Sequence, residues 1–315
     1  MNDKVDYLNN PWAPVGQSVI IDSELKAQVD EVGYAVRDWV TADQLNALKA
    51  LFETEHDFRE DDGGMFYSVY SQNLDYRKKI HDKINEILLP TIEKNLKDYR
   101  VVLYSFVVKA AGKKSEFHMH QDTTGVDELK YSPLNLWIPL SDVSEENGCL
   151  AVVPKSHRFF TPYRSISFPA PFDGIADVVR KYLSPIPLKA GETLVFDNRL
   201  VHNSPANLTN NTRVAIVCGI LPKDATLTTC FKPTYTLGGK VEMIEHEDDY
   251  LLKHPNFLID CQMRPDSGKS IGWRDDNYQE ITSETFENLC AKYGVAKTTE
   301  HVEPMGECNL IGEPA

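Results

Sequence analysis

Hydrophobic residues recur at helical spacing in two segments of the first hundred residues. In residues 40–53 (VTADQLNALKALFE), the apolar stripe follows Thr41 and Gln44, which stand at the spacing of a capping box. Residues 76–89 (YRKKIHDKINEILL) carry a second stripe, with isoleucine or leucine at every third or fourth position. The pattern predicts a helix in each segment, the second interrupted or restarted at Pro90.

From residue 101 the pattern changes to short runs of β-branched and aromatic residues separated by Gly, Pro, Asn and Asp. No long amphipathic segment interrupts these runs, which disfavours a parallel α/β sheet and favours an antiparallel sandwich or barrel. A last helix is predicted from Ser283 to Tyr293, ended by Gly294. The predicted strands are residues 100–109, 134–140, 149–154, 192–197 and 213–221.

The overall charge narrows the choice of partners. The 315 residues include 47 acidic and 33 basic side chains, for a formal charge of -14, which argues against nucleic acid and against an anionic membrane surface as partners. The first residues lack a signal-peptide pattern, and no apolar run approaches the roughly 18 residues that span a bilayer. We therefore expect a soluble, cytoplasmic protein.

The six cysteines lie singly along the chain and form no CxxC pair, so we expect reduced thiols rather than a zinc knuckle or redox motif. Cys149 and Cys218 stand inside predicted strands and are interpreted as small core residues. The sequence also lacks an HExxH zinc-protease helix, a GxSxG elbow and a P-loop.

One stretch gathers residues that bind metals. In FHMHQDTTG (residues 117–125), His118, His120 and Asp122 would all face one side of an extended strand, so alternation alone does not choose among them. His202 follows about eighty residues later, after another predicted strand. A His-x-Asp pair with a distant histidine is the ligand set of the 2-His-1-carboxylate facial triad.

The chemistry of such a triad explains the residue types. Imidazole suits Fe(II), one carboxylate partly neutralises it, and three open positions accept a bidentate 2-oxo acid and dioxygen. An arginine beyond the last histidine would bind the far carboxylate of the 2-oxo acid through two charge-assisted hydrogen bonds, which lysine cannot reproduce. Arg213 fits that role.

The order and spacing of three longer motifs resemble one family. They are HQD (residues 120–122), LNLWIPLSDVSEENGCLAVVPKSH (134–157) and LKAGETLVFDNRLVHNS (188–204), with Arg213 eleven positions after His202. Together they resemble the phytanoyl-CoA dioxygenase-like branch of the Fe(II)- and 2-oxoglutarate-dependent oxygenases, over about residues 30 to 222.

The resemblance implies a mainly β fold with flanking helices and a double-stranded β-helix core, that is, a cupin-like jelly roll. We expect residues 1–315 to form a single oxygenase domain. Its expected parts are a helical N-terminal support (about 1–100), the jelly-roll core (about 101–222) and a C-terminal extension with a helix (about 223–315).

The resemblance also implies roles for individual residues. The family spaces its aspartate two residues after the histidine ligand, which selects His120 over His118, and His118 becomes a candidate for the substrate pocket. His157 is expected to close a turn. The expected iron ligands are His120, Asp122 and His202, and the expected co-substrate contacts are Arg213, Ser204, Gln121, Trp137 and Tyr104.

The expected reaction consumes 2-oxoglutarate and O2, releases succinate and CO2, and hydroxylates an unactivated C–H bond. Desaturation, epoxidation or cyclisation would use the same site. The strongly acidic composition disfavours an acyl-CoA, so we expect a small molecule such as an amino-acid-derived or secondary metabolite. The sequence does not indicate the oligomeric state.

Two variable segments are expected to line the substrate pocket. Residues 61–73, with paired glycines and aromatic residues, are interpreted as a mobile cover. Residues 159–174 concentrate aromatic residues and prolines, and Arg158 or Arg164 would meet an anionic group of the substrate.

Two other readings compete with the oxygenase. A cupin-like metal-binding protein or isomerase would use His118, His120 and His202 without 2-oxoglutarate, but it leaves Arg213 without a role. A catalytically inactive relative that serves as a binding module is disfavoured by the complete ligand set.

Overall fold

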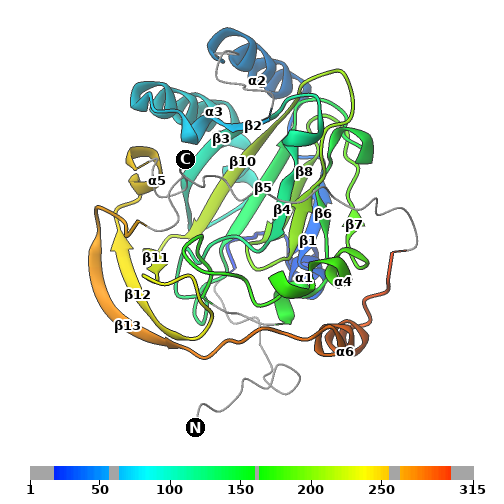
Figure 1. The fold of residues 1–315 in the computed structure, drawn as a ribbon. Coiled ribbons are helices and arrows are strands. Elements are labelled where there is room, and N and C mark those ends of the chain that lie inside the picture. Colours follow the sequence, from blue (N-terminus) through cyan, green and yellow to red (C-terminus); the bar gives the residue numbers. More distant parts are fainter. Residues whose placement is uncertain (1–17, 57–63, 160–162, 255–262, 299–315) are drawn as a thin grey trace, which may run out of the picture.

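The computed structural model describes residues 18–56, 64–159, 163–254 and 263–298. Antiparallel sheets dominate these residues, with helices packed on the outside (Figure 1). A six-stranded and a four-stranded sheet enclose a cavity and form the jelly roll, so the prediction of a mainly β, jelly-roll fold is confirmed. No helix within the described ranges has the length and apolar character needed to cross a membrane.

The larger sheet carries most of the hydrophobic core, and all its pairings are antiparallel. Each strand predicted beyond residue 100 is present, although the one over 149–154 is shortened to two residues. In order across the sheet, its strands are β1 (Tyr34–Arg37), β8 (Thr193–Asp197), β5 (Leu134–Pro139), β10 (Arg213–Pro222), β3 (Tyr99–Lys109) and β2 (Met65–Tyr67).

The smaller sheet lies across the cavity from the larger one. Its strands are two to four residues long, and the chain reaches them from distant parts of the sequence. In order they are β4 (Phe117–His120), β9 (His202–Ser204), β6 (Ala151–Val152) and β7 (Ser184–Pro185).

The described part of the first hundred residues forms three α-helices: α1 (Ser23–Val32), α2 (Ala42–Glu55) and α3 (Leu74–Asn95). The capping box predicted for α2 is formed, because the Thr41 hydroxyl accepts from the Gln44 amide and the Gln44 side chain accepts from the Thr41 amide. The apolar faces of α2 and α3 pack with one face of β3 and β10 in the main core. This packing fixes which face of β3 points away from the cavity.

The expected break in the second helix is wrong, because α3 continues through Pro90 to Asn95. A proline inside a helix costs one backbone hydrogen bond and crowds the preceding turn. Burial of Leu88, Thr91 and Ile92 on both sides of Pro90 keeps the helix in place. The first hundred residues also contribute β1 and β2 to the main sheet, beyond the helical support expected of them.

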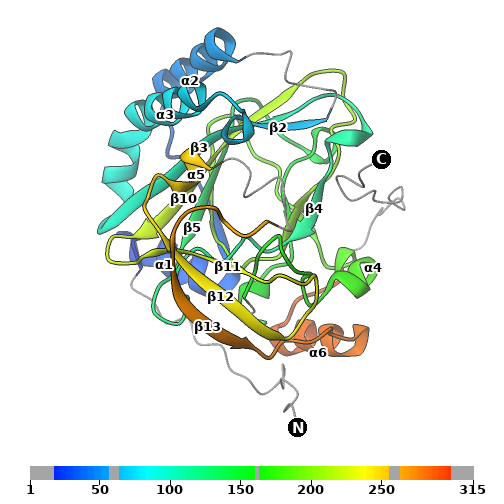
Figure 2. The same ribbon diagram turned by 60° about the vertical axis from the view of Figure 1, so that its left-hand side comes forward.

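Beyond residue 222 the chain builds a three-stranded sheet that the sequence pattern does not reveal. Its strands are β11 (Leu227–Phe231), β12 (Gly239–His246) and β13 (Lys269–Asp276), and it lies beside the main sheet (Figure 2). The short helix α5 (Tyr250–Lys253) packs against α3 and β3. The predicted last helix is confirmed as α6 (Ser283–Tyr293), with Gly294 as its left-handed cap. Helix α4 (Ala176–Arg180) precedes β7.

His246 ties the C-terminal sheet to its surroundings. Its ring stacks on Tyr250 with a centroid separation of 3.7 Å, and its Nε2 lies 2.8 Å from the Thr229 hydroxyl. Burial, together with the nearby His254 and Arg264, lowers the pKa of His246 to about 4. The neutral ring is therefore the form that the folded protein stabilises.

We expect acid to destabilise the fold partly through His246. Its pKa rises from about 4 in the folded chain to about 6.5 in the unfolded chain, so the unfolded state binds the proton first as the pH falls below 6.5. The free energy of unfolding should decrease between pH 7 and pH 5, with about 1 kcal/mol of that decrease due to His246. Urea unfolding at pH 7 and pH 5 measures this contribution. The free energy of unfolding should decrease less in His246→Gln than in the wild type, whereas His118→Gln, at an exposed histidine, should keep the wild-type pH dependence. An equal pH dependence in all three proteins would contradict this role.

Candidate metal centre and its cavity

Two of the predicted ligands are paired by the small sheet. In the register of β4 against β9, His120 stands directly opposite His202, and their ring centroids are 4.2 Å apart. Asp122 follows the end of β4, and its amide donates to the carbonyl of Asn198 over 2.9 Å. The potential ligand atoms of His120, Asp122 and His202 all lie within 4.8 Å of one another.

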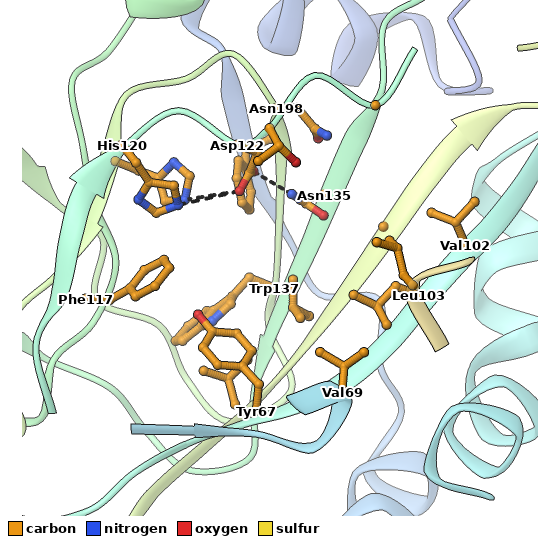
Figure 3. Close-up of a pocket in the computed structure, with 18 of the residues that line it drawn as sticks. Tyr67, Val69, Val102, Leu103, Phe117, His120, Asp122, Asn135, Trp137 and Asn198 are labelled. Carbon is orange, nitrogen blue, oxygen red and sulfur yellow. Dashed lines mark hydrogen bonds and ion pairs between the residues drawn. The ribbon is translucent and has the colours of Figure 1, made fainter. Parts of the chain in front are cut away.

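The remaining hydrogen bonds of the two imidazoles orient them. Nδ1 of His120 lies 2.7 Å from the carbonyl oxygen of His118, and Nδ1 of His202 lies 2.9 Å from that of Leu200. A carbonyl only accepts, so each Nδ1 carries the proton and each Nε2 presents its lone pair. Both Nε2 atoms face Asp122 Oδ1, at 3.6 Å and 4.0 Å (Figure 3).

Asn135 orients the carboxylate. Its Nδ2 donates to Asp122 Oδ2 over 2.6 Å, which leaves Oδ1 toward the two imidazoles (Figure 3). The sequence analysis missed this residue, although it lies two positions before Trp137 on β5 and therefore on the same face of that strand. The alternation of side chains along this strand, which places Asn135 on the face of Trp137, could have identified it.

The electrostatics of the cluster favour the protonation states that bind a divalent cation. Burial, with the adjacent His120, lowers the pKa of His202 to about 4, so this ring is neutral at pH 7. Burial opposes ionisation of Asp122, but His202, His120 and Asn135 outweigh it and lower the pKa of the carboxyl. Two imidazoles and one carboxylate match the donor set of a non-haem Fe(II) site with open positions.

Arg213 lines the same cavity as the three ligand residues. It is 2% exposed, and its Nη2 donates to the Gly148 carbonyl and to the Ser204 hydroxyl, at 3.1 Å and 3.3 Å. Its Nε and Nη1 are buried and have no hydrogen-bond partner within the described ranges. Burial lowers the pKa of Arg213 to about 10, so the guanidinium remains charged at neutral pH. Unpaired, charged N–H groups in a cavity fit an anionic ligand.

Gly148 allows the close packing behind Arg213. Its φ of +76° is in the left-handed region, and a Cβ built there would lie 2.3 Å from the Pro205 carbonyl oxygen. The Gly148 carbonyl accepts from both Arg213 and Ser204, whose hydroxyl donates over 2.8 Å. The predicted association of Ser204 with Arg213 is therefore present in the structure.

Lys109 is a buried basic side chain beside Arg213, and the sequence motifs do not predict it. It stands opposite Arg213 in the pairing of β3 with β10, and its Nζ donates to the carbonyls of Ser204 and Pro205. Burial, with the charge of Arg213, lowers the pKa of Lys109 to about 6. A largely neutral amine at pH 7 then joins the end of β9 to β3.

The structure separates the other predicted co-substrate contacts. Trp137 lines the cavity, and its ring lies 5.2 Å from the guanidinium carbon of Arg213. Gln121 is not part of the cavity lining, because its side chain alternates away from the ligands and donates to the Arg199 carbonyl. Tyr104 is also outside it, because its ring is on the face of β3 that packs in the main core. Neither Gln121 nor Tyr104 therefore lines the cavity that holds the ligand cluster, and their contact with the co-substrate stays a prediction.

Tyr67 lies near the position expected of Tyr104. It comes from β2, lines the cavity, and lies on the same side as Trp137 (Figure 3). Burial, followed by the nearby Tyr70 and Asp122, raises its pKa well above the ordinary value, so its hydroxyl remains a hydrogen-bond donor. Of the predicted cover over 61–73, residues 61–63 lie outside the described ranges. Met65 to Tyr67 form an edge strand of the main sheet, so the described part is not a separate loop.

The remaining histidine predictions are resolved by burial. His118 is exposed and is not part of the cavity lining. His157 is 1% exposed, with Nε2 3.0 Å from the Asp30 carbonyl oxygen, in the 3-10 turn Ser156–Arg158 that follows β6. The structural role expected of His157 agrees with this position.

Neither arginine proposed for an anionic substrate is available to one. Arg158 pairs with Glu31 over 2.8 Å, outside the cavity. Arg164 is buried, forms an ion pair with Glu128, and donates from Nε to the Asp122 carbonyl over 2.6 Å. Arg164 therefore fixes the backbone that carries a ligand residue.

The fold and the cluster together define a class of protein: a jelly-roll protein with two histidines and one aspartate converging inside the roll. The family model for phytanoyl-CoA dioxygenase (PhyH) matches residues 29–215, and the chain belongs to this family.

Individual relatives match over shorter stretches. Phytanoyl-CoA dioxygenase domain-containing protein 1 of Danio rerio is 29% identical over 139 residues, which are 40% of this chain and 47% of the relative. Phytanoyl-CoA dioxygenase of Arabidopsis thaliana is 31% identical over 131 residues, 39% of this chain and 45% of the relative. The chain thus spans about half the length of the curated relatives it matches.

Among solved structures, the non-heme alpha ketoglutarate dependent carbocyclase SnoK from nogalamycin biosynthesis superposes with a TM-score of 0.49 at 20% identity. The match covers 67% of this chain and 89% of that chain.

We expect Asn135→Ala to weaken metal binding about 10- to 100-fold, because the carboxylate of Asp122 loses the hydrogen bond that orients it. Equilibrium dialysis against Fe(II) or Ni(II) under anaerobic conditions measures the effect. Asn203→Ala is the matched control, since Asn203 is buried on β9 but does not line the cavity. Equal metal affinity in the Asn135→Ala variant and the wild type would show that the hydrogen bond has no such role.

Proposed function

We propose that this protein is a non-haem Fe(II)- and 2-oxoglutarate-dependent dioxygenase that hydroxylates an unactivated C–H bond of a small molecule, with release of succinate and CO2. The observation that carries this proposal is the presence, in one cavity, of a His-Asp-His cluster within 4.8 Å and a buried arginine with unpaired N–H groups. Membership of the phytanoyl-CoA dioxygenase family supports it.

Each residue has a defined task in this proposal. His120, Asp122 and His202 hold the metal, with Asn135 keeping Asp122 Oδ1 toward it. Arg213 and Ser204 bind the distal carboxylate of 2-oxoglutarate, beside the ring of Trp137. When bound, Fe(II) with 2-oxoglutarate and O2 supplies the oxidising power for C–H hydroxylation.

The protein also controls water and protons around the reacting groups. The cavity of about 210 Å³ lies between the two sheets, and most of its lining is apolar, which limits competing reactions with water. Tyr67 and Tyr70 line it as neutral hydroxyls, because burial raises the pKa of Tyr70 to about 12 and raises that of Tyr67 well above its ordinary value. Neither side chain adds a charge to the cavity.

The structure gives little support to a metal-dependent isomerase that uses His118. The ligand cluster contains His120, Asp122 and His202, whereas His118 is exposed and does not line the cavity. An isomerase without 2-oxoglutarate would also leave the charged side chain of Arg213 facing the cavity without a ligand.

A direct test of the proposal is the absorption spectrum of the anaerobic protein. Saturating Fe(II) and 2-oxoglutarate together should produce a weak charge-transfer band in the visible region that neither produces alone. Asp122→Ala should lose the band, because the remaining two imidazoles hold the metal poorly. Absence of the band in the wild-type protein at saturating ligand would refute the proposed function.

Arg213→Lys should raise the 2-oxoglutarate concentration needed for half-maximal band intensity about 10- to 100-fold, because lysine replaces a two-pronged contact by a single point charge. Titration with 2-oxoglutarate at fixed Fe(II) measures this shift. Arg180→Lys, at an arginine paired with Asp177 outside the cavity, serves as the matched control. An unchanged requirement in Arg213→Lys would remove Arg213 from the co-substrate site.

A further inference from the structure

The cavity has two ends of different character. The metal-ligand cluster, the guanidinium of Arg213 and the amine of Lys109 are at one end. The other end, called here the apolar arm, is lined mainly by aliphatic side chains. Val69, Val102 and Leu103 lie there, away from His120 and Asp122 (Figure 3), and Leu227 and Leu251 of the C-terminal extension complete the lining. No charged side chain from the described ranges lines the apolar arm.

Three positions show that this aliphatic surface is open to the cavity. Val217 and Gly219 are half-buried, whereas their neighbours Ile216, Cys218 and Ile220 on β10 are fully buried. Leu103 on the adjacent β3 is likewise half-buried between buried residues. Alternation of exposure along an otherwise buried sheet means that one face of it borders empty space.

Gly219 contributes to that space. A Cβ built on it would lie 3.3 Å from a methyl carbon of Val102 and 3.8 Å from the Cβ of Leu103. Any larger side chain would therefore project into the apolar arm and fill part of it. The strand also changes register between Gly219 and Ile220, next to this point.

The far wall of the apolar arm comes from outside the family match. Leu227, Thr228 and Thr229 of β11 and Leu251 of α5 line the cavity, whereas the family model ends at residue 215. The side chain of Arg77, on α3, donates to the Leu251 carbonyl and holds α5 in place. The metal cluster therefore belongs to the part shared with the family, and the far wall belongs to the C-terminal extension of this chain.

A charged substrate group would have no partner in the apolar arm. Transfer of a carboxylate or ammonium group from water into an apolar environment is strongly unfavourable unless an opposite charge or hydrogen bonds compensate it. The hydroxyls of Thr228 and Thr229 carry no charge that could compensate one, and they already bond to the Thr226 carbonyl and to His246 Nε2. Arg158 and Arg164, the two arginines considered for an anionic group, are paired elsewhere.

The surface beside the apolar arm also disfavours phosphate groups. A hollow next to β11 and α5 is lined by Asp224, Glu245, Glu247, Asp248 and Asp249, against Arg100, Lys223 and Lys253. Two of these basic side chains already pair with acidic ones, Arg100 with Asp248 and Lys253 with Asp249. The excess negative charge would repel the phosphates of a CoA thioester.

From these observations we infer that the substrate is a neutral, mostly apolar small molecule in free form, and that the C-terminal extension selects it through the far wall of the apolar arm. The inference rests on the proposed function, because it assigns the apolar arm to the compound that is oxidised. It replaces the amino-acid-derived compounds expected from the sequence with uncharged ones.

Competition for a neutral fluorescent probe tests the inference. Nile red bound to the full chain, loaded anaerobically with Fe(II) and 2-oxoglutarate, is displaced by four compounds on one ten-carbon skeleton: decanol, decanoate, decylamine and decanoyl-CoA. Decanol should displace the probe at a concentration at least about tenfold lower than any charged compound. Equal or tighter binding of decanoate, decylamine or decanoyl-CoA would overturn the inference.

Variants locate the binding in the apolar arm. Leu251→Asn keeps the branched arrangement of the four non-hydrogen side-chain atoms but replaces two methyl groups by a polar amide, and should weaken decanol binding about tenfold. Gly219→Val should weaken it by filling space and leaves the C-terminal extension unchanged. The control is Ile271→Asn, at a residue of β13 that is 40% exposed and does not line the cavity. Loss of binding in Ile271→Asn, or unchanged binding in both other variants, would contradict the assignment.

The two proposals fail in different ways. If no charge-transfer band forms on addition of Fe(II) and 2-oxoglutarate, the proposed oxygenase function is refuted, and the inferred substrate class is refuted with it. If the band forms but a charged compound displaces the probe as well as decanol does, the oxygenase stands and only the substrate class is wrong.

Discussion

Antiparallel pairing between β4 and β9 places His120 opposite His202, although the two residues are some eighty positions apart in the chain. The rest of the centre is arranged around that pairing. Asp122 follows at the end of β4, Asn135 reaches it from the other sheet, and Arg164 holds its carbonyl from a third segment. Each ligand atom is thus positioned by backbone pairing first and by side-chain hydrogen bonds second, which gives a metal site little freedom to change its geometry.

Local motifs, together with the family that they resemble, predicted the groups that converge. The HQD motif, the later histidine and Arg213 stand at spacings that reflect strand lengths, and the structure brings His120, Asp122, His202, Ser204 and Arg213 to one cavity. The capping box of α2 and the glycine that ends α6 were similarly readable, because both depend on residues within one turn of the helix end.

The features that local patterns do not predict depend on contacts distant in sequence. Whether Tyr104 faces the cavity depends on which side of β3 the helices cover, and the sequence of β3 is apolar on both faces. The helix across Pro90 is retained by tertiary packing, and β13 escaped notice because most of its residues are exposed and it has no alternating apolar pattern. Lys109 was missed because a lysine at the end of a strand ordinarily faces solvent.

The far wall of the apolar arm and the metal-ligand cluster come from different parts of the chain, so mutations can change one without the other. The ligands, Asn135 and Arg213 all precede residue 215, whereas Leu227 and Leu251 come after it. Mutations in β11 and α5 can accumulate over evolutionary time without altering any group that holds the metal. If the proposed function holds, a lineage can acquire a new substrate through these segments while the groups proposed to bind the metal and the co-substrate are inherited intact.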